Sequence, residues 1–226
     1  MTVGQILYLL EREYGTHPRR HHRDAVSELI LTILSQNTSD VNSKRAFDKL
    51  VADFGTWQAV AKARVEDIQA SIRSGGLAQV KAGRIKRILR QIPEREGRLD
   101  LEFLGQLPTQ EAKAWLKQLP GVGPKTAGCV LLFSLGRPVL PVDTHVYRVA
   151  QRLGLIGSKV SPPKAHDVLE NLVPPQDIYR FHLLTIEHGR RICRAQKPLC
   201  HRCVLGEACP SRQVREALSE QLVALV

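Results

Sequence analysis

The sequence predicts an all-α protein. Apolar residues recur at helical spacing along most of the 226 residues. No segment alternates apolar and polar residues for long enough to predict a sheet, and the one strand-like run, 138–142, is interrupted by Pro138 and Pro141. Apolar residues make up 43% of the chain, which is enough to form a core.

Stripes of apolar residues mark the expected helices. In chain order they fall in 25–34, 47–54, 65–72, 85–92, 115–119, 146–153 and 165–172. Gly75 and Gly76 predict the end of the third helix, Pro93 predicts the end of the fourth, and Ser161 followed by Pro162 predicts the start of the last. We also expect an amphipathic helix in the first ten residues and a helical tail after Pro210.

The charge of the chain indicates a polyanionic partner. Its net charge is +11, which a fold does not require and which DNA or RNA would explain; a basic protein with some other role is the alternative. We find no apolar run of about 18 residues, so no membrane span is expected. The start lacks a basic leader, so we expect a cytoplasmic, nucleoid-associated protein with reduced thiols.

A glycine-containing turn separates two helical patterns at 119–127. Gly121 and Gly123 permit backbone conformations that other residues resist, and Pro124 suits the first turn of the following helix. Amide groups of this turn and of the helix N-terminus could bind a backbone phosphate. A plain tight turn between packed helices is the alternative.

Four of the five cysteines lie within seventeen residues. They are Cys193, Cys200, Cys203 and Cys209, whereas Cys129 lies in a distant apolar run. In a reducing compartment this clustering favours a metal centre over disulfides. Zinc ribbons usually contain two C-x2-C knuckles, and here there is one; four thiolates can also hold a [4Fe–4S] cluster.

Lys125 and Asp143 each permit a structural and a chemical interpretation. Lys125 follows the glycine turn, where a neutral amine could attack the sugar C1′ of a bound strand and form a Schiff base; most lysines are simply solvated. Asp143 precedes the helical run that starts at Thr144 and is a typical N-cap, which would also hold a carboxylate rigid.

Several motifs together resemble the helix-hairpin-helix DNA glycosylases, in particular endonuclease III. L-P-G-V-G-x-K-T-A at 119–127 is followed by V-D-T-H-V at 142–146. Further motifs of this family follow in the family's order along the chain. They lie in the segments 34–40, 76–77 and 188–190 and in the spacing of the four cysteines. The resemblance extends from about Asp24 to Pro210.

The resemblance implies two helical lobes with a DNA-binding cleft between them. Residues 23–136 would form a six-helix barrel that ends in the helix-hairpin-helix motif. Residues 1–22 and 137–226 would form a discontinuous domain in which Cys193, Cys200, Cys203 and Cys209 hold a [4Fe–4S] cluster. We expect a monomer.

The resemblance also implies a bifunctional DNA glycosylase and abasic-site lyase. Lys125 would displace a damaged, oxidised pyrimidine in double-stranded DNA and cleave the abasic strand by β-elimination, with Asp143 as its acidic partner. A base-mismatch glycosylase is the nearest alternative, although such relatives generally lack this lysine. A non-catalytic iron–sulfur protein that binds DNA or acts in redox chemistry is the alternative from another class.

The remaining candidates are expected to contact DNA. Gln36 and Asn37 would fill the space that the extruded base leaves, and Leu77 would wedge into the stack, unless it packs on a neighbouring helix. His145 either supports the site or is a buried structural histidine. The residues expected at backbone phosphates are Gly121, Gly123, Arg190, Arg191, Arg194 and Lys197.

The sequence departs from the family pattern at three positions. Asn37 stands where glutamine is expected, with Gln36 one position earlier. Ala78 replaces a frequent aromatic residue after the wedge leucine, and Pro124 replaces a basic residue before the lysine. These departures bear on the base preference and on the details of base extrusion, whereas the reaction class that the resemblance implies does not depend on them.

Overall fold

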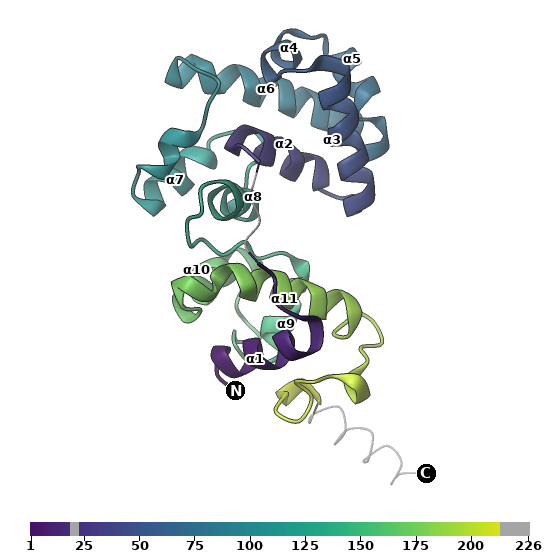
Figure 1. Ribbon diagram of the computed structural model, residues 1–226, viewed down its shortest axis with the longest axis vertical. Helices are drawn as coiled ribbons and strands as arrows, with labels where there is room; N and C mark the ends of the chain where they lie inside the picture. The colour runs from purple at the N-terminus through teal and green to yellow at the C-terminus, as the bar shows by residue number, and fades with distance from the viewer. Residues whose placement is uncertain (19–22, 213–226) are drawn as a thin grey trace. The chain divides into compact units, whose positions relative to one another are not determined.

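The computed structural model describes residues 1–18 and 23–212, and these ranges contain helices and no strand (Figure 1). The all-α prediction is therefore confirmed. In the same ranges no helix combines the length and the apolar character needed to cross a membrane. The predicted tail beyond residue 212 and residues 19–22 of the predicted 1–22 segment lie outside the described residues.

The chain divides into two compact units. Within the described residues, the hairpin unit comprises 23–139 and the cysteine unit comprises 1–18 with 140–212.

The hairpin unit is built around a buried helix, α2 (Ala25–Ser35). This helix packs against α3, α6, α8 and η3. Nine of its eleven residues are buried, so it is enclosed on nearly all sides, as an almost continuously apolar helix requires. The other elements of the unit are α3 (Asp40–Phe54), α4 (Trp57–Lys62), α5 (Val65–Ser71), η1 (Arg73–Gly75), α6 (Ala78–Glu96), η2 (Glu102–Gly105), α7 (Thr109–Leu116), α8 (Pro124–Cys129) and the π-helical turn η3 (Val130–Ser134).

Short polar side chains start the first helices of this unit. The side chains of Asp24, Ser39 and Thr56 accept hydrogen bonds from backbone N–H groups at distances of 2.9, 3.3 and 3.2 Å, respectively. These N-caps satisfy donors that a helix terminus otherwise leaves without partners.

The expected end of the long helix at Pro93 was wrong, because α6 continues to Glu96. A proline removes one N–H donor and crowds the preceding turn, but it stands here within the last turn. The N–H of Gly97 then donates to the carbonyl of Pro93 at 2.9 Å and closes the helix.

The cysteine unit packs three helices that come from both ends of the chain. α11 (Ile178–Arg191) lies against both α1 (Val3–Tyr14) and α9 (Thr144–Arg152) (Figure 1). The N-terminal segment is amphipathic as expected, since Val3, Ile6, Leu7 and Leu10 are buried. The other elements are α10 (Pro162–Leu172), η4 (Pro175–Asp177) and η5 (Cys200–Arg202).

Arg137 connects the chain segment that follows the hairpin to the residues around the start of α7 by hydrogen bonds. Its guanidinium donates to the carbonyls of Gly105 and Leu107 and to the hydroxyl of Thr109 at 2.7, 3.0 and 2.7 Å. The bonds join residues about thirty positions apart and span the start of α7.

We expect Arg137→Ala to lower the free energy of unfolding by about 2 kcal/mol, because charged hydrogen bonds are lost and their acceptors lose a partner. Urea unfolding measures the change. Arg98→Ala is the matched control, since the Arg98 side chain is 65% exposed and pairs with Asp100 at the surface. Equal losses in the two variants would contradict the assignment.

Candidate functional site

The glycine turn adopts the conformation that its residues predict. Gly121 has φ 77, which favours glycine, and it is exposed. The N–H of Val122 donates to the carbonyl of Leu119 at 3.2 Å, and both of these side chains are buried. The turn is therefore anchored by apolar packing, while its outer backbone stays accessible. The helix α8 begins at Pro124, where the sequence predicts a start.

Lys125 is the second residue of α8 and is half-buried. Because α8 packs against α2, its amine lies in the electrostatic environment of the buried α2 carboxyl, Glu28. The amine of Lys125 is therefore neither enclosed in the core nor fully solvated. A nucleophile requires this combination of access and partial shielding from water.

Glu28 is a buried acid that the sequence analysis missed. Its side chain is 9% exposed and accepts a hydrogen bond from the Thr32 hydroxyl at 3.5 Å. Burial raises the pKa of Glu28, while the positive charges of Arg23 and Lys125 oppose the rise. Its position among the apolar residues of the 25–34 stripe was the available signal for a buried carboxyl.

Gln36 is hydrogen-bonded to the hairpin. Its Nε2 donates to the carbonyl of Gly121 at 3.0 Å, and its Oε1 accepts from Arg84 Nη1 at 3.1 Å. Arg84 also lies against the turn, since a Cβ at Gly121 would be 2.9 Å from Arg84 Cδ. Arg84, which the sequence analysis also missed, therefore connects α6, the end of α2 and the turn.

Asn37 and Leu77 are exposed and have unusual backbones. Asn37 has φ 53 and Leu77 has φ 49, in the left-handed region that residues with side chains rarely adopt. The Leu77 side chain is 56% exposed and stands directly before α6. Two residues are expected to fill the DNA gap. Asn37 is the accessible one, whereas the side chain of Gln36 is held by its hydrogen bonds to Gly121 and Arg84.

Asp143 is the N-cap of α9 in the cysteine unit. Its Oδ1 accepts hydrogen bonds from the N–H groups of His145 and Val146, both at 2.8 Å. The carboxylate is half-buried and its orientation is fixed by two bonds, while Oδ2 is left for other interactions.

His145 packs where α9 and α11 approach closely. Its Nδ1 lies 3.0 Å from Arg148 Nη2, and Arg148 also donates to the carbonyl of Gly189 at 2.8 Å. A Cβ on Gly189 would lie 2.9 Å from the Cβ of His145, so a glycine is needed at this approach. The ring is half-buried and held by these contacts.

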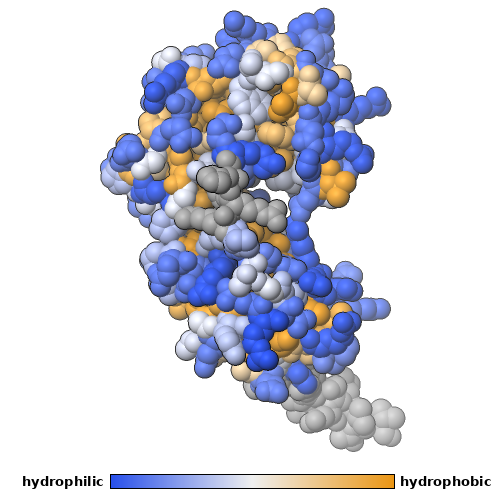
Figure 2. Space-filling view, viewed as in Figure 1, coloured by the Kyte–Doolittle hydropathy of each residue, from blue (hydrophilic) through white to orange (hydrophobic). Residues whose placement is uncertain are grey.

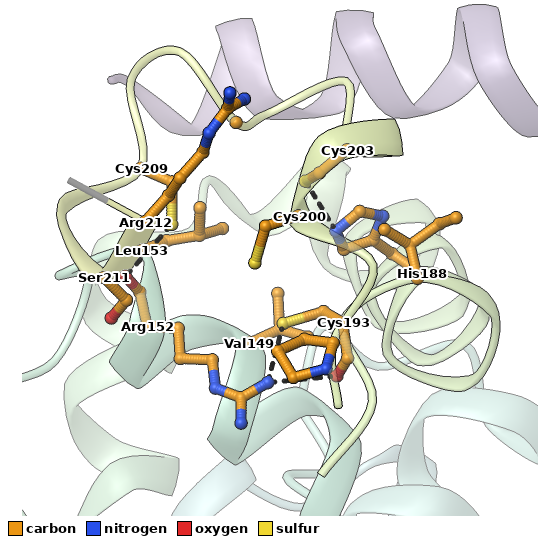
Figure 3. A pocket seen from close by; sticks show the side chains of 13 residues that line it. Val149, Arg152, Leu153, His188, Cys193, Cys200, Cys203, Cys209, Ser211 and Arg212 are labelled. Carbon is orange, nitrogen blue, oxygen red and sulfur yellow. Dashed lines mark hydrogen bonds between the residues drawn. The ribbon is translucent and has the colours of Figure 1, made fainter. Parts of the chain in front are cut away.

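The side chains of Cys193, Cys200, Cys203 and Cys209 line one pocket with apolar groups of Val149, Leu153 and Ile192 (Figure 3). Among the described residues, no group of three or more His, Cys, Asp or Glu side chains is arranged to hold a metal ion.

Nitrogen atoms of two side chains lie near the cysteine sulfurs. Arg152 Nη1 donates to Cys193 Sγ at 3.3 Å, and His188 Nε2 lies 3.5 Å from Cys203 Sγ (Figure 3). Tyr14 Oη lies 2.9 Å from the other ring nitrogen of His188. Burial lowers the pKa of His188 to about 4 and raises the pKa of the Cys203 thiol to about 11.

The basic residues predicted to contact phosphates are exposed. They are Arg190, Arg191, Arg194 and Lys197. Arg191 pairs with Glu187 at 2.8 Å and its guanidinium carbon lies 5.1 Å from the centre of the Tyr14 ring, so its charge is partly used within the protein. Figure 2 shows hydrophilic residues over most of the visible surface, with smaller hydrophobic patches between them.

Three comparisons relate the chain to known proteins. Residues 30–175 match the model of the HhH-GPD superfamily of base excision DNA repair proteins. Endonuclease III of Thermotoga maritima is 38% identical over 193 residues, which cover 85% of this chain and 86% of that protein. A relative from Arabidopsis thaliana is 38% identical over 186 residues, and the match spans 82% of this chain and 61% of the relative.

A solved structure agrees over nearly the whole chain. It is a trapped endonuclease III–DNA covalent intermediate, with a TM-score of 0.80 and 29% identity, and the match covers 96% of this chain and 99% of that one.

We expect Glu28→Gln to become more stable relative to wild type as the pH rises. Because the folded-state pKa lies above the unfolded-state value, stability from Glu28 is fully present below the ordinary pKa and is lost as the pH rises through the raised one. Glutamine does not ionise, so the variant does not lose this stability. Urea unfolding at about pH 4 and about pH 8 measures the difference in unfolding free energy between the variant and wild type.

The control is Glu94→Gln, which changes an exposed acid on α6. A stability difference between Glu28→Gln and wild type that is independent of pH would contradict the raised pKa.

Proposed function

The chain belongs to the HhH-GPD superfamily of base excision DNA repair proteins, and from that premise we propose that it removes oxidised pyrimidines from double-stranded DNA and then cleaves the abasic strand through a lysine Schiff base. It is an endonuclease III-like enzyme, in the class of DNA glycosylases and abasic-site lyases. The observation that carries the proposal is the half-buried Lys125 one residue after the start of α8, next to the exposed glycine turn.

The proposed reaction begins with the neutral amine of Lys125. Its lone pair attacks the sugar C1′, the bond from C1′ to the base breaks, and the base leaves with the bonding electrons and takes up a proton. Loss of a proton from the amine and opening of the sugar ring then give a Schiff base. Removal of a C2′ proton expels the 3′ phosphate by β-elimination, and water releases the lysine.

Asp143 has the electrostatic role in this reaction. A carboxylate held by two N–H groups at a helix start needs little reorganisation when positive charge develops on the sugar, so it stabilises that charge. His145 supports the same helix turn.

Several accessible groups would bind the damaged duplex. The exposed Gly121 and the half-buried Gly123 offer backbone amides to a phosphate, and Arg190, Arg194 and Lys197 offer exposed positive charge. Asn37 would occupy the space of the extruded nucleotide, with Leu77 inserted into the base stack. The net charge of +11 supports a duplex as the partner.

The cysteine unit would be the iron–sulfur domain, and the hairpin unit the six-helix barrel. Four half-buried thiols line one pocket with a cation and an imidazole at two of the sulfurs, which suits a negatively charged [4Fe–4S] cluster held by Cys193, Cys200, Cys203 and Cys209. When bound, the cluster would stabilise a segment that has few apolar residues.

We expect Lys125→Gln to abolish the covalent adduct that borohydride traps on DNA with an oxidised pyrimidine, because glutamine cannot form a Schiff base. Base release should fall by about 100-fold or more. The adduct is measured on a denaturing gel, and base release by chromatography of the free base.

Lys117→Gln is the control, because Lys117 is an exposed lysine eight positions before the nucleophile. If wild type released thymine or adenine from mismatches and formed no adduct, the enzyme would be a mismatch glycosylase. If the protein bound duplex DNA and replacing both Lys125 and Asp143 changed none of its activities, its role would be non-catalytic.

We expect the purified protein to be brown and to contain about four iron atoms per chain rather than zinc. Cys203→Ser should lose the colour and part of the thermal stability, since cluster binding and folding are coupled. Visible absorption, elemental analysis and thermal unfolding measure these effects. Cys129→Ala should keep the colour, and a colourless wild-type protein with one zinc would contradict the assignment.

A further inference from the structure

Lys81 is a lysine inside the core of the hairpin unit. It is 1% exposed and is among the largest fully buried side chains of the described residues. Burial lowers its pKa, and the charge of Arg84 adds to this effect. Because a buried ammonium is costly, a lysine persists in such a place when the hydrogen bonds it makes are needed.

Its amine donates to two backbone carbonyls from separate segments. Lys81 Nζ lies 2.6 Å from the carbonyl oxygen of Leu34 and 2.7 Å from that of Gly75. Leu34 is in the last turn of α2, where carbonyls lack partners within the helix, and Gly75 ends η1. One side chain therefore ties together the ends of two elements.

The two tied ends lead directly into the exposed left-handed residues. Asn37 follows Leu34 by three positions, and Leu77 follows Gly75 by two. The two loops are neighbours, because a Cβ on Gly76 would lie 3.9 Å from the carbonyl oxygen of Asn37. Left-handed backbones at residues with side chains are strained and persist when their surroundings fix them.

We propose that Lys81 is a positioning residue that sets Asn37 and Leu77 side by side for entry into the duplex beside the extruded nucleotide. The inference rests on the proposed function, because it needs a damaged duplex as the substrate. Lys81 touches no DNA in this proposal and acts through the two carbonyls. Its loss would affect the opening of a base stack and leave the chemistry of Lys125 in place.

The experiment compares Lys81→Met with Lys86→Met. Lys86 is a matched control, since it lies on the same helix and its Nζ donates to the backbone carbonyl of Ala63 at 2.7 Å, away from both loops. Two substrates are used: a duplex with an oxidised pyrimidine, and a single-stranded oligonucleotide with a preformed abasic site, which needs no base extrusion.

We expect Lys81→Met to lower single-turnover base release from the duplex by about tenfold or more, since small displacements of positioning groups cost rate. The fluorescence of 2-aminopurine next to the lesion, which rises when the stack opens, should lose its rise. Borohydride trapping on the single strand should equal that of wild type, and Lys86→Met should match wild type in all three measurements.

A double-mutant cycle tests whether the effect passes through the loop. If Lys81 acts by placing Leu77, Lys81→Met should add little to the loss caused by Leu77→Ala. Additive losses, unchanged fluorescence, or an equal loss on both substrates would overturn the proposal. If Lys81→Met does not fold, Lys81→Gln, which keeps a neutral donor, replaces it in the same cycle.

Different results would refute the proposed function and the positioning role of Lys81. A wild-type protein that neither releases the base nor forms the single-strand adduct would refute the proposed function. A fully active Lys81→Met enzyme would refute only the role of Lys81.

Discussion

The structure of the hairpin unit depends on hydrogen bonds made by polar side chains that are buried or half-buried beside α2. Buried polar groups are costly without partners, so each one restricts how the helices can pack. Lys81 ties the end of α2 to η1, and Gln36 ties the same end to the glycine turn. Apolar packing brings the helices together, whereas these directional bonds set where the loops emerge.

The cysteine unit arranges its candidate groups by a different means. Asp143 is oriented by the backbone N–H groups of a helix start, and the cysteines lie in a segment with little regular structure after α11. Side chains from the helices reach this segment, since Arg152 donates to the carbonyls of Arg194 and Ala195 at 2.6 and 3.0 Å. The segment is thus held to α9 by an arginine.

Much of the helical pattern could be predicted from the sequence, because apolar spacing reports directly on the buried face of a helix. The glycine turn and the start at Pro124 followed from residue types with strong backbone preferences. The roles of Lys81 and Glu28 did not follow, since their partners come from distant segments. Lys81 does share its helical face with Ile85, Ile88 and Ile92, so a charged residue on an apolar stripe was the signal to consider.

The contact between Gly121 and Arg84 has a consequence for how such sequences can diverge. A side chain at position 121 would strain a backbone with φ 77 and would also displace an arginine that holds Gln36. The residue types at positions 84 and 121 should therefore covary among homologues. An alanine at the turn should be accompanied by a shorter side chain on α6, and the glutamine amide would then need another partner.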